Sequence, residues 1–170
     1  MSNKKETVIT KESANKLKVV REFEGSLEDV WDAWTKPELL DQWWAPNPWR
    51  TKTKSMDFRE GGTWLYSMDG PEGERHWCKV NYEKINPKKF FSGDDAFCDE
   101  NGNPSDLAPS MHWEVAFNAE GNHTKVIVNI TFASEEDLEK IVEMGFKEGF
   151  TAAHGNLDEF LARKTNQSES

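Results

Sequence analysis

The sequence predicts an α+β fold, in which an antiparallel sheet packs against helices near both ends of the chain. Three observations support this. Residues 27–46 are rich in tryptophan and leucine at helical spacing, residues 51–132 alternate between apolar and polar side chains, and residues 134–162 carry a broad apolar stripe. Closely spaced turn signals in the middle stretch indicate hairpins, so we expect a meander with one buried face.

The first strand is expected at residues 16–24, where Leu17, Val19 and Phe23 share one face. A glycine then interrupts the pattern. This strand would form one side of the sheet.

Both ends of the chain are polar and charged. We expect residues 1–14 to form a flexible N-terminus and residues 163–170 a flexible C-terminal tail. Residues 15–162 are then expected to form a single domain, because no linker divides them.

Two short helices follow the first strand. Ser26 is suited to cap the first helix, because a serine hydroxyl accepts a hydrogen bond from a free backbone amide there. Pro37 suits the first turn of the second helix, where no amide hydrogen is needed. Their apolar side chains are Leu27, Val30, Trp31 and Trp34 in the first helix and Leu39, Leu40, Trp43 and Trp44 in the second.

Six strands are expected in residues 51–132. A further strand starts near Phe90, and the acidic residues 94–109 are expected to form a long loop. The clearest alternation occurs in four sets: Trp64, Tyr66 and Met68; His76, Cys78, Val80 and Tyr82; Met111, Trp113, Val115 and Phe117; Val126, Val128, Ile130 and Phe132.

One long helix, capped by Ser134, is expected to end the chain. Gly145, Gly149 and Ala153 lie on one side of it, within the apolar stripe. Because a glycine inside a helix costs about 1 kcal/mol relative to alanine, these small residues need a reason. They either let the sheet approach closely or leave open volume.

Composition excludes several classes of partner. The net charge of −10 argues against nucleic acid and anionic membranes, which both need basic surfaces. No apolar run is long enough for a membrane span, and no signal-peptide pattern starts the chain, so we expect a cytoplasmic protein. The two cysteines fit no metal or redox motif, and we expect reduced thiols, no metal and no cofactor.

Three sequence blocks carry a family pattern: V-W-D-A-W-T-K-P-E-L-L-D-Q-W-W-A-P at 30–46, D-F-R-E-G-G-T-W at 57–64 and M-G-F-K-E-G-F at 144–150. They resemble one branch of the START-like, birch-pollen-allergen-like (SRPBCC) superfamily. This branch is named for the C-terminal domain of the activator of the 90-kDa heat-shock chaperone ATPase. The resemblance covers about residues 15–162.

The resemblance implies a helix-grip fold, in which a curved antiparallel sheet grips the long C-terminal helix around a cavity. It implies binding of an apolar or aromatic small molecule there, or a protein-interaction module that contacts a heat-shock chaperone in the stress response, or a cyclase or hydrolase using the same cavity. We expect binding rather than catalysis, because no motif for hydrolase, nucleotide or metal chemistry occurs. The protein would be a monomer or a homodimer.

The candidate ligand-binding residues are those that the strand and helix patterns turn inward, together with an arginine at one turn. His76 is expected to orient the ligand, with a satisfied core histidine as the alternative. Arg59 is expected to hold an anionic group at the cavity mouth, with a structural salt bridge at the Gly61-Gly62 turn as the alternative. A filled aromatic core is the alternative to a pocket. The full set is Arg59, Trp64, Tyr66, His76, Tyr82, Met111, Trp113, Phe146, Gly149 and Phe150.

Overall fold

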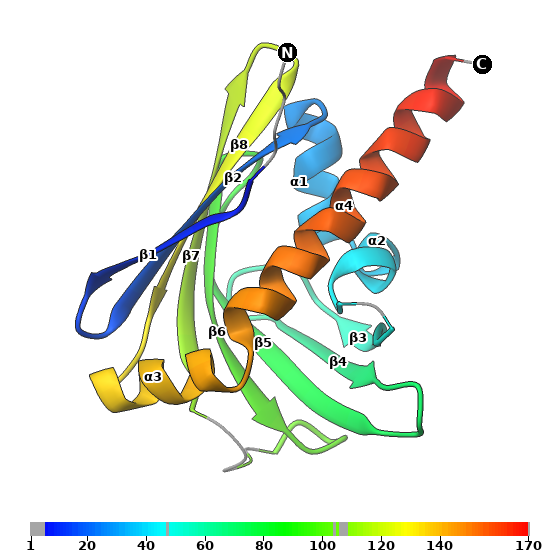
Figure 1. Cartoon of the computed structure of the whole chain (residues 1–170). Coiled ribbons are helices and arrows are strands. Elements are labelled where there is room, and N and C mark those ends of the chain that lie inside the picture. The colour runs from blue at the N-terminus through cyan, green and yellow to red at the C-terminus, as the bar shows by residue number, and fades with distance from the viewer. Residues whose placement is uncertain (1–5, 47, 104, 106–108, 170) are drawn as a thin grey trace.

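The computed structural model of the chain describes residues 6–46, 48–103, 105 and 109–169. In chain order the elements are β1 (Val8–Ser13), β2 (Lys16–Glu24), α1 (Leu27–Thr35), α2 (Pro37–Trp43), β3 (Arg50–Met56), β4 (Thr63–Asp69), β5 (Arg75–Asn86), β6 (Phe90–Cys98), β7 (Met111–Glu120), β8 (His123–Thr131), α3 (Glu135–Glu143) and α4 (Phe146–Glu169). The strands form one curved sheet, and the helices lie on its concave side (Figure 1).

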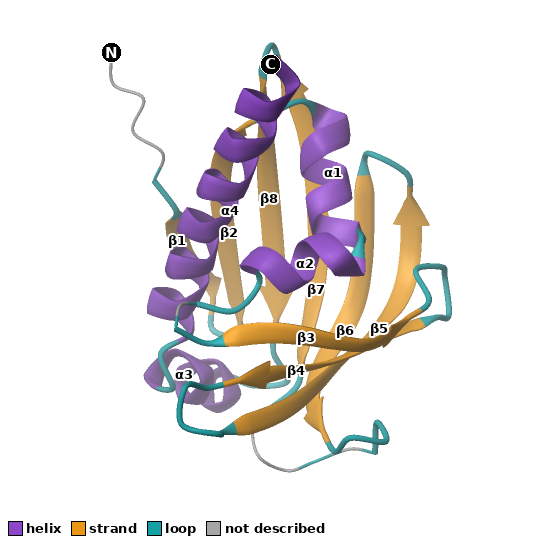
Figure 2. Cartoon of the chain, turned by 90° about the vertical axis from the view of Figure 1, so that its right-hand side faces the viewer, coloured by secondary structure: helices purple, strands orange, loops and turns teal. Residues whose placement is uncertain are grey.

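The sheet confirms the predicted antiparallel meander. Strands β3 to β8 each pair with the next strand in the chain, and β8 then pairs with β2, giving the order β1-β2-β8-β7-β6-β5-β4-β3. The register shifts in β3 between Thr53 and Ser55, and in β5 between Tyr82 and Lys84. Such bulges bend a strand, and both lie on the half of the sheet that curves beneath the helices (Figure 2).

The N-terminal segment differs from the expectation of a flexible end. Residues Val8–Ser13 form β1, which pairs antiparallel with β2 at the edge of the sheet. Ile9 packs against the core, but most of the strand is exposed. Backbone hydrogen bonds rather than burial hold this strand, so its side chains show no alternation that the sequence could reveal.

The two short helices begin where the sequence predicts. The Ser26 hydroxyl accepts a hydrogen bond from the Asp29 amide at 3.1 Å, which caps α1, and Pro37 occupies the first turn of α2. The indole Nε1 of Trp43 donates to the Ala33 carbonyl at 2.9 Å and ties α2 to α1. Most of their apolar side chains are buried, and Leu27, Leu39 and Trp44 are partly buried. The helices therefore present a wide aromatic surface to the sheet.

The C-terminal helix is broken, contrary to the single helix expected. Ser134 caps α3 as predicted, but α3 ends at Glu143 and α4 begins at Phe146. Gly145 between them has a φ of +96°, in the left-handed region that terminates helices. Helix α4 also continues to Glu169, through residues 163–169 that were expected to form a tail.

Strand β6 is longer than predicted. It runs to Cys98 and takes in residues 94–98, which were expected to begin the acidic loop. Residues 104 and 106–108 of that predicted loop lie outside the described residues. Two acidic residues, Asp94 and Asp95, therefore lie inside the sheet.

Candidate functional site

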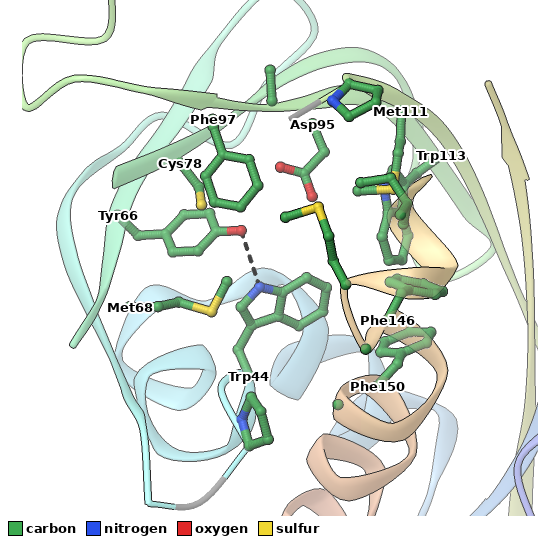
Figure 3. A pocket seen from close by; sticks show the side chains of 17 residues that line it. Trp44, Tyr66, Met68, Cys78, Asp95, Phe97, Met111, Trp113, Phe146 and Phe150 are labelled. Carbon is green, nitrogen blue, oxygen red and sulfur yellow. Dashed lines mark hydrogen bonds between the residues drawn. The ribbon is translucent and has the colours of Figure 1, made fainter. Parts of the chain in front are cut away.

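A cavity of about 250 Å³ lies between the sheet and the helices (Figure 3). Its walls come from β4, β5, β6 and β7 on one side and from the ends of α2, α3 and α4 on the other. Met144, which is 52% exposed, lies at its mouth. Six of the ten predicted residues line it: Tyr66, Met111, Trp113, Phe146, Gly149 and Phe150.

Trp64 and Tyr82 lie deeper and do not line this cavity. They border a smaller space of about 30 Å³ under the aromatic side chains of α1 and α2. The ring of Trp64 stacks on Tyr66 at 4.0 Å between centroids, and Tyr82 contacts Phe58 at 4.8 Å. At this depth the filled aromatic core, which the sequence left as an alternative, is what the structure has.

His76 and Arg59 lie outside the cavity, at opposite ends of β4. His76 pairs with Met68 next to the β4–β5 turn, where its exposed ring stacks on Trp49. Arg59 lies in the β3–β4 turn, exposed, and its Nε donates to Asp57 at 2.7 Å. The alternative given for Arg59, a structural salt bridge at the turn, is therefore the arrangement observed. The orienting roles expected of both residues have no geometric support.

Sequence reasoning did not select several residues that line the cavity. Met68 and Cys78 share strand faces with predicted residues, so the same alternation was available for them. Trp44 was expected to pack but not to line a cavity; its indole Nε1 donates to the Tyr66 hydroxyl at 3.2 Å (Figure 3). The main omissions are Trp44, Met68, Cys78, Asp95, Phe97 and Ile141.

Asp95 is the acidic residue of the cavity wall. It lies on β6 between Val80 of β5 and Met111 of β7, and its carboxyl group is directed into the cavity between Phe97 and Trp113 (Figure 3). Its exposed fraction is 8%. The strand alternates at this point, so the preceding residue faces outward.

The preceding residue, Asp94, lies on the opposite face of the sheet and has a different environment. It is exposed, and its carboxylate lies 2.8 Å from Nδ1 of His112. Among the described residues, no cation lies within ion-pair distance of the Asp95 carboxyl; its one polar contact is the backbone amide of Ala96. Two neighbouring aspartates thus have opposite environments.

Burial controls the protonation of the cavity. It raises the pKa of Asp95 to about 7, while the hydrogen bond from the Ala96 amide acts in the opposite direction. Burial also raises the pKa values of the Tyr66 hydroxyl and the Cys78 thiol, which therefore stay protonated near neutral pH. Among the described lining residues, Asp95 alone changes charge near neutrality. Cys78 is not a thiolate nucleophile in this setting.

In the part of the chain that the structure describes, no group of three or more His, Cys, Asp or Glu side chains is arranged to hold a metal ion. Over the same residues, no helix is both long and apolar enough to cross a membrane. The cavity can therefore provide a ligand with apolar contacts and with a single carboxyl group that titrates near neutral pH.

The curved sheet, the helix that it grips and the cavity between them define a helix-grip protein, a fold of the ligand-binding type. The chain belongs to the family described as activator of Hsp90 ATPase homolog 1-like protein, whose family model matches residues 24–162. No curated protein gives a significant match to the sequence.

Solved structures with the same fold come from several bacteria. A protein from Arthrobacter aurescens is 31% identical, with a TM-score of 0.86 over 92% of this chain and 91% of that protein. A protein from Mycobacterium smegmatis is 27% identical, with a TM-score of 0.81 over 91% and 97%. The AHSA1 protein from Silicibacter pomeroyi is 19% identical, with a TM-score of 0.69 over 88% and 99%, and supports the fold alone.

Proposed function

We propose that the protein binds a small apolar or aromatic molecule in the cavity between the sheet and the start of α4. The observation that carries this proposal is the cavity itself, about 250 Å³ with walls that are mainly aromatic and thioether side chains. Drug-sized ligands occupy pockets of about 300–1,000 Å³, so the ligand is smaller, of roughly one ring with a short substituent.

Gly149 of α4 supports the proposal. A Cβ atom built on Gly149 would meet only Pro46 Cγ, at 3.7 Å, which is ordinary contact. The glycine therefore does not admit a tightly packed neighbour. Its lack of a side chain leaves volume in the cavity, at the usual helix cost of about 1 kcal/mol.

Blocking the cavity tests the proposal. Gly149→Leu would place an isobutyl group in it, and Gly155→Leu, on the same helix with open space around its Cβ, is the matched control. With phenethyl alcohol as the probe, we expect calorimetric affinity to fall by more than about tenfold in the first variant only. Saturating probe should raise the melting temperature of the wild type, by linkage. Equal binding by both variants would refute a cavity site.

The family description favours a second function, an interaction with a heat-shock chaperone. One fold carries many functions, so the description by itself assigns none to this chain. The same variant separates the two proposals. A chaperone-binding surface should raise chaperone ATPase activity equally in the wild type and in Gly149→Leu, whereas a ligand-binding protein without that surface should leave the ATPase rate unchanged.

A further inference from the structure

Asp95 is a buried acid in an otherwise apolar cavity, and nothing in the proposed function accounts for it. A buried carboxylate without a partner is costly, because it loses its water and gains no compensating charge. Ligand pockets use a small number of polar groups on mainly apolar walls to fix the orientation of the ligand. Asp95 is 8% exposed and is directed into the cavity (Figure 3). The missing partner is therefore sought in the ligand.

We infer that the ligand is an organic amine, whose ammonium group pairs with the Asp95 carboxylate while its apolar body lies against Phe146 and Phe150. This inference rests on the proposed function, because it names the class of molecule that the same cavity binds. The ammonium would lie among aromatic rings, including those of Phe97 and Trp113 on either side of Asp95. Aromatic faces attract cations, most strongly where water is excluded.

Charge and shape favour an amine over other partners. No lysine or arginine is among the residues that line the cavity, so the described protein supplies no internal counter-ion. A metal ion would need further ligands, and the described residues form no such group. An anionic ligand would place like charges together. A neutral alcohol would fit the walls equally well but would leave the ionised form of Asp95 unpaired, so it serves as the comparison.

The first experiment compares three probes of nearly equal size by calorimetry at about pH 8: phenethylamine, phenethyl alcohol and hydrocinnamate. We expect the amine to bind at least about tenfold more tightly than the alcohol, and the carboxylate to bind most weakly. Asp95→Asn should bring the amine and alcohol affinities to within about twofold of each other. Asp94→Asn is the matched control, one residue away on the outer face, and should preserve the preference.

The number of protons released on binding is a second measurement, and it needs no variant. Asp95 holds its proton to about pH 7, so at about pH 6 an arriving ammonium must displace it to the buffer. Calorimetry in buffers of different ionisation enthalpy should show close to one proton released per amine at about pH 6, almost none at about pH 8, and none for the alcohol. Affinity for the amine should therefore be about tenfold lower at about pH 6 than at about pH 8.

The other groups near Asp95 should not release protons between about pH 6 and pH 8. The pKa values of Tyr66 on β4, Cys78 and Tyr82 on β5 and Cys98 on β6 are all raised above their ordinary values, so these groups stay protonated. The wall formed by α3 and α4 contributes side chains that do not titrate: Ile141, Met144, Phe146 and Phe150. On the outer face, the Asp94→Asn control shows whether the pair of Asp94 and His112 contributes to the measured proton release.

The outcomes separate the two proposals. If the alcohol binds, is blocked by Gly149→Leu and binds as tightly as the amine, the cavity is a ligand site but the amine inference is wrong. An amine preference that survives Asp95→Asn, or amine binding at about pH 6 without proton release, also overturns it. If no probe binds or Gly149→Leu changes nothing, the proposed function itself fails.

Discussion

Two segments of α4 face the same sheet with opposite results. The middle of the helix, around His154 and Leu157, packs on a filled core, where Phe23 and Leu157 are fully buried and His154 is 1% exposed; we call this the filled end. The first turns of the helix, from Phe146 to Phe150, border the cavity and form the hollow end. Both segments belong to one helix, so the difference lies in the side chains, and the same helix–sheet interface contains a filled core beside an open cavity.

The buried polar groups follow the same division. At the filled end, His154 Nδ1 shares a hydrogen bond of 2.8 Å with Thr7 Oγ1, and Arg21 donates to both Thr7 and Asp158. At the hollow end, Asp95 has only a backbone amide. The filled end pairs its charged groups within the chain, although His154 Nε2 and Trp34 Nε1 have no hydrogen-bond partner among the described residues, whereas at the hollow end a carboxyl group faces open volume.

The largest expected effect comes from one substitution made at both ends. Phe23→Ala removes a ring that is 0% exposed and should cost about 3–5 kcal/mol of unfolding free energy. Phe146→Ala removes a half-buried ring that already borders open volume, so it loses fewer contacts and should cost about 1 kcal/mol. Urea unfolding measures both. Equal costs would mean that the hollow end is as well packed as the filled one.

The two ends should also respond to pH in opposite ways. The unfolded chain releases the Asp95 proton near its ordinary pKa of 3.8, whereas the folded protein holds it to about 7, so stability falls as pH rises through this interval. Asp95→Asn should abolish that fall, with a gain of at most about 4 kcal/mol above neutrality, since one pKa unit corresponds to about 1.4 kcal/mol. At the filled end, burial and then Arg21 lower the pKa of His154 from 6.5 to about 3. There the unfolded chain takes up the proton first, so stability falls as pH drops below about 6.5.

Urea unfolding of Asp95→Asn, His154→Gln and the wild type between about pH 5 and pH 8.5 tests both predicted directions of the pH dependence of stability. Relative to neutral pH, His154→Gln should lose about 2 kcal/mol less than the wild type at about pH 5, and the two should run parallel above about pH 7.5. If Asp95→Asn gains nothing on the alkaline side, Asp95 is not held protonated by burial, and the hollow end is wetter than the structure indicates.

The sequence predicted most of the fold because alternation and helical spacing are direct consequences of burial on one face. Strands β4, β5, β7 and β8 and helices α1 and α2 have strong patterns of this kind. Strand β1 was missed since an exposed edge strand has no apolar period. The helix break at Gly145 was missed because a glycine in an apolar stripe fits close packing, open volume and a left-handed turn equally well.

Asp95 shows why the site was harder to predict than the fold. The residues around it are acidic and lead into a turn, so their composition indicates a loop. From Phe91, however, every second residue faces inward: Phe91, Gly93 and Asp95 are all buried. An inward carboxyl group contradicts the usual pattern of a strand, and local contradictions of this kind concentrate at functional sites.

The smallest expected effect concerns the hinge between α3 and α4. Gly145→Ala forces an alanine to a φ of +96° and should cost about 1–2 kcal/mol, because a Cβ atom clashes with its own backbone in that region. Gly155→Ala lies within α4, where nothing stands within 4 Å of the added methyl group, and should stabilise by about 0.5–1 kcal/mol. Melting temperatures that shift in opposite directions would show that the glycine beside the cavity serves backbone geometry and the glycine beyond it does not. If Gly145→Ala instead stabilises the protein, α3 and α4 join into the continuous helix that the sequence pattern predicts, and the cavity mouth at Met144 must close or move with it.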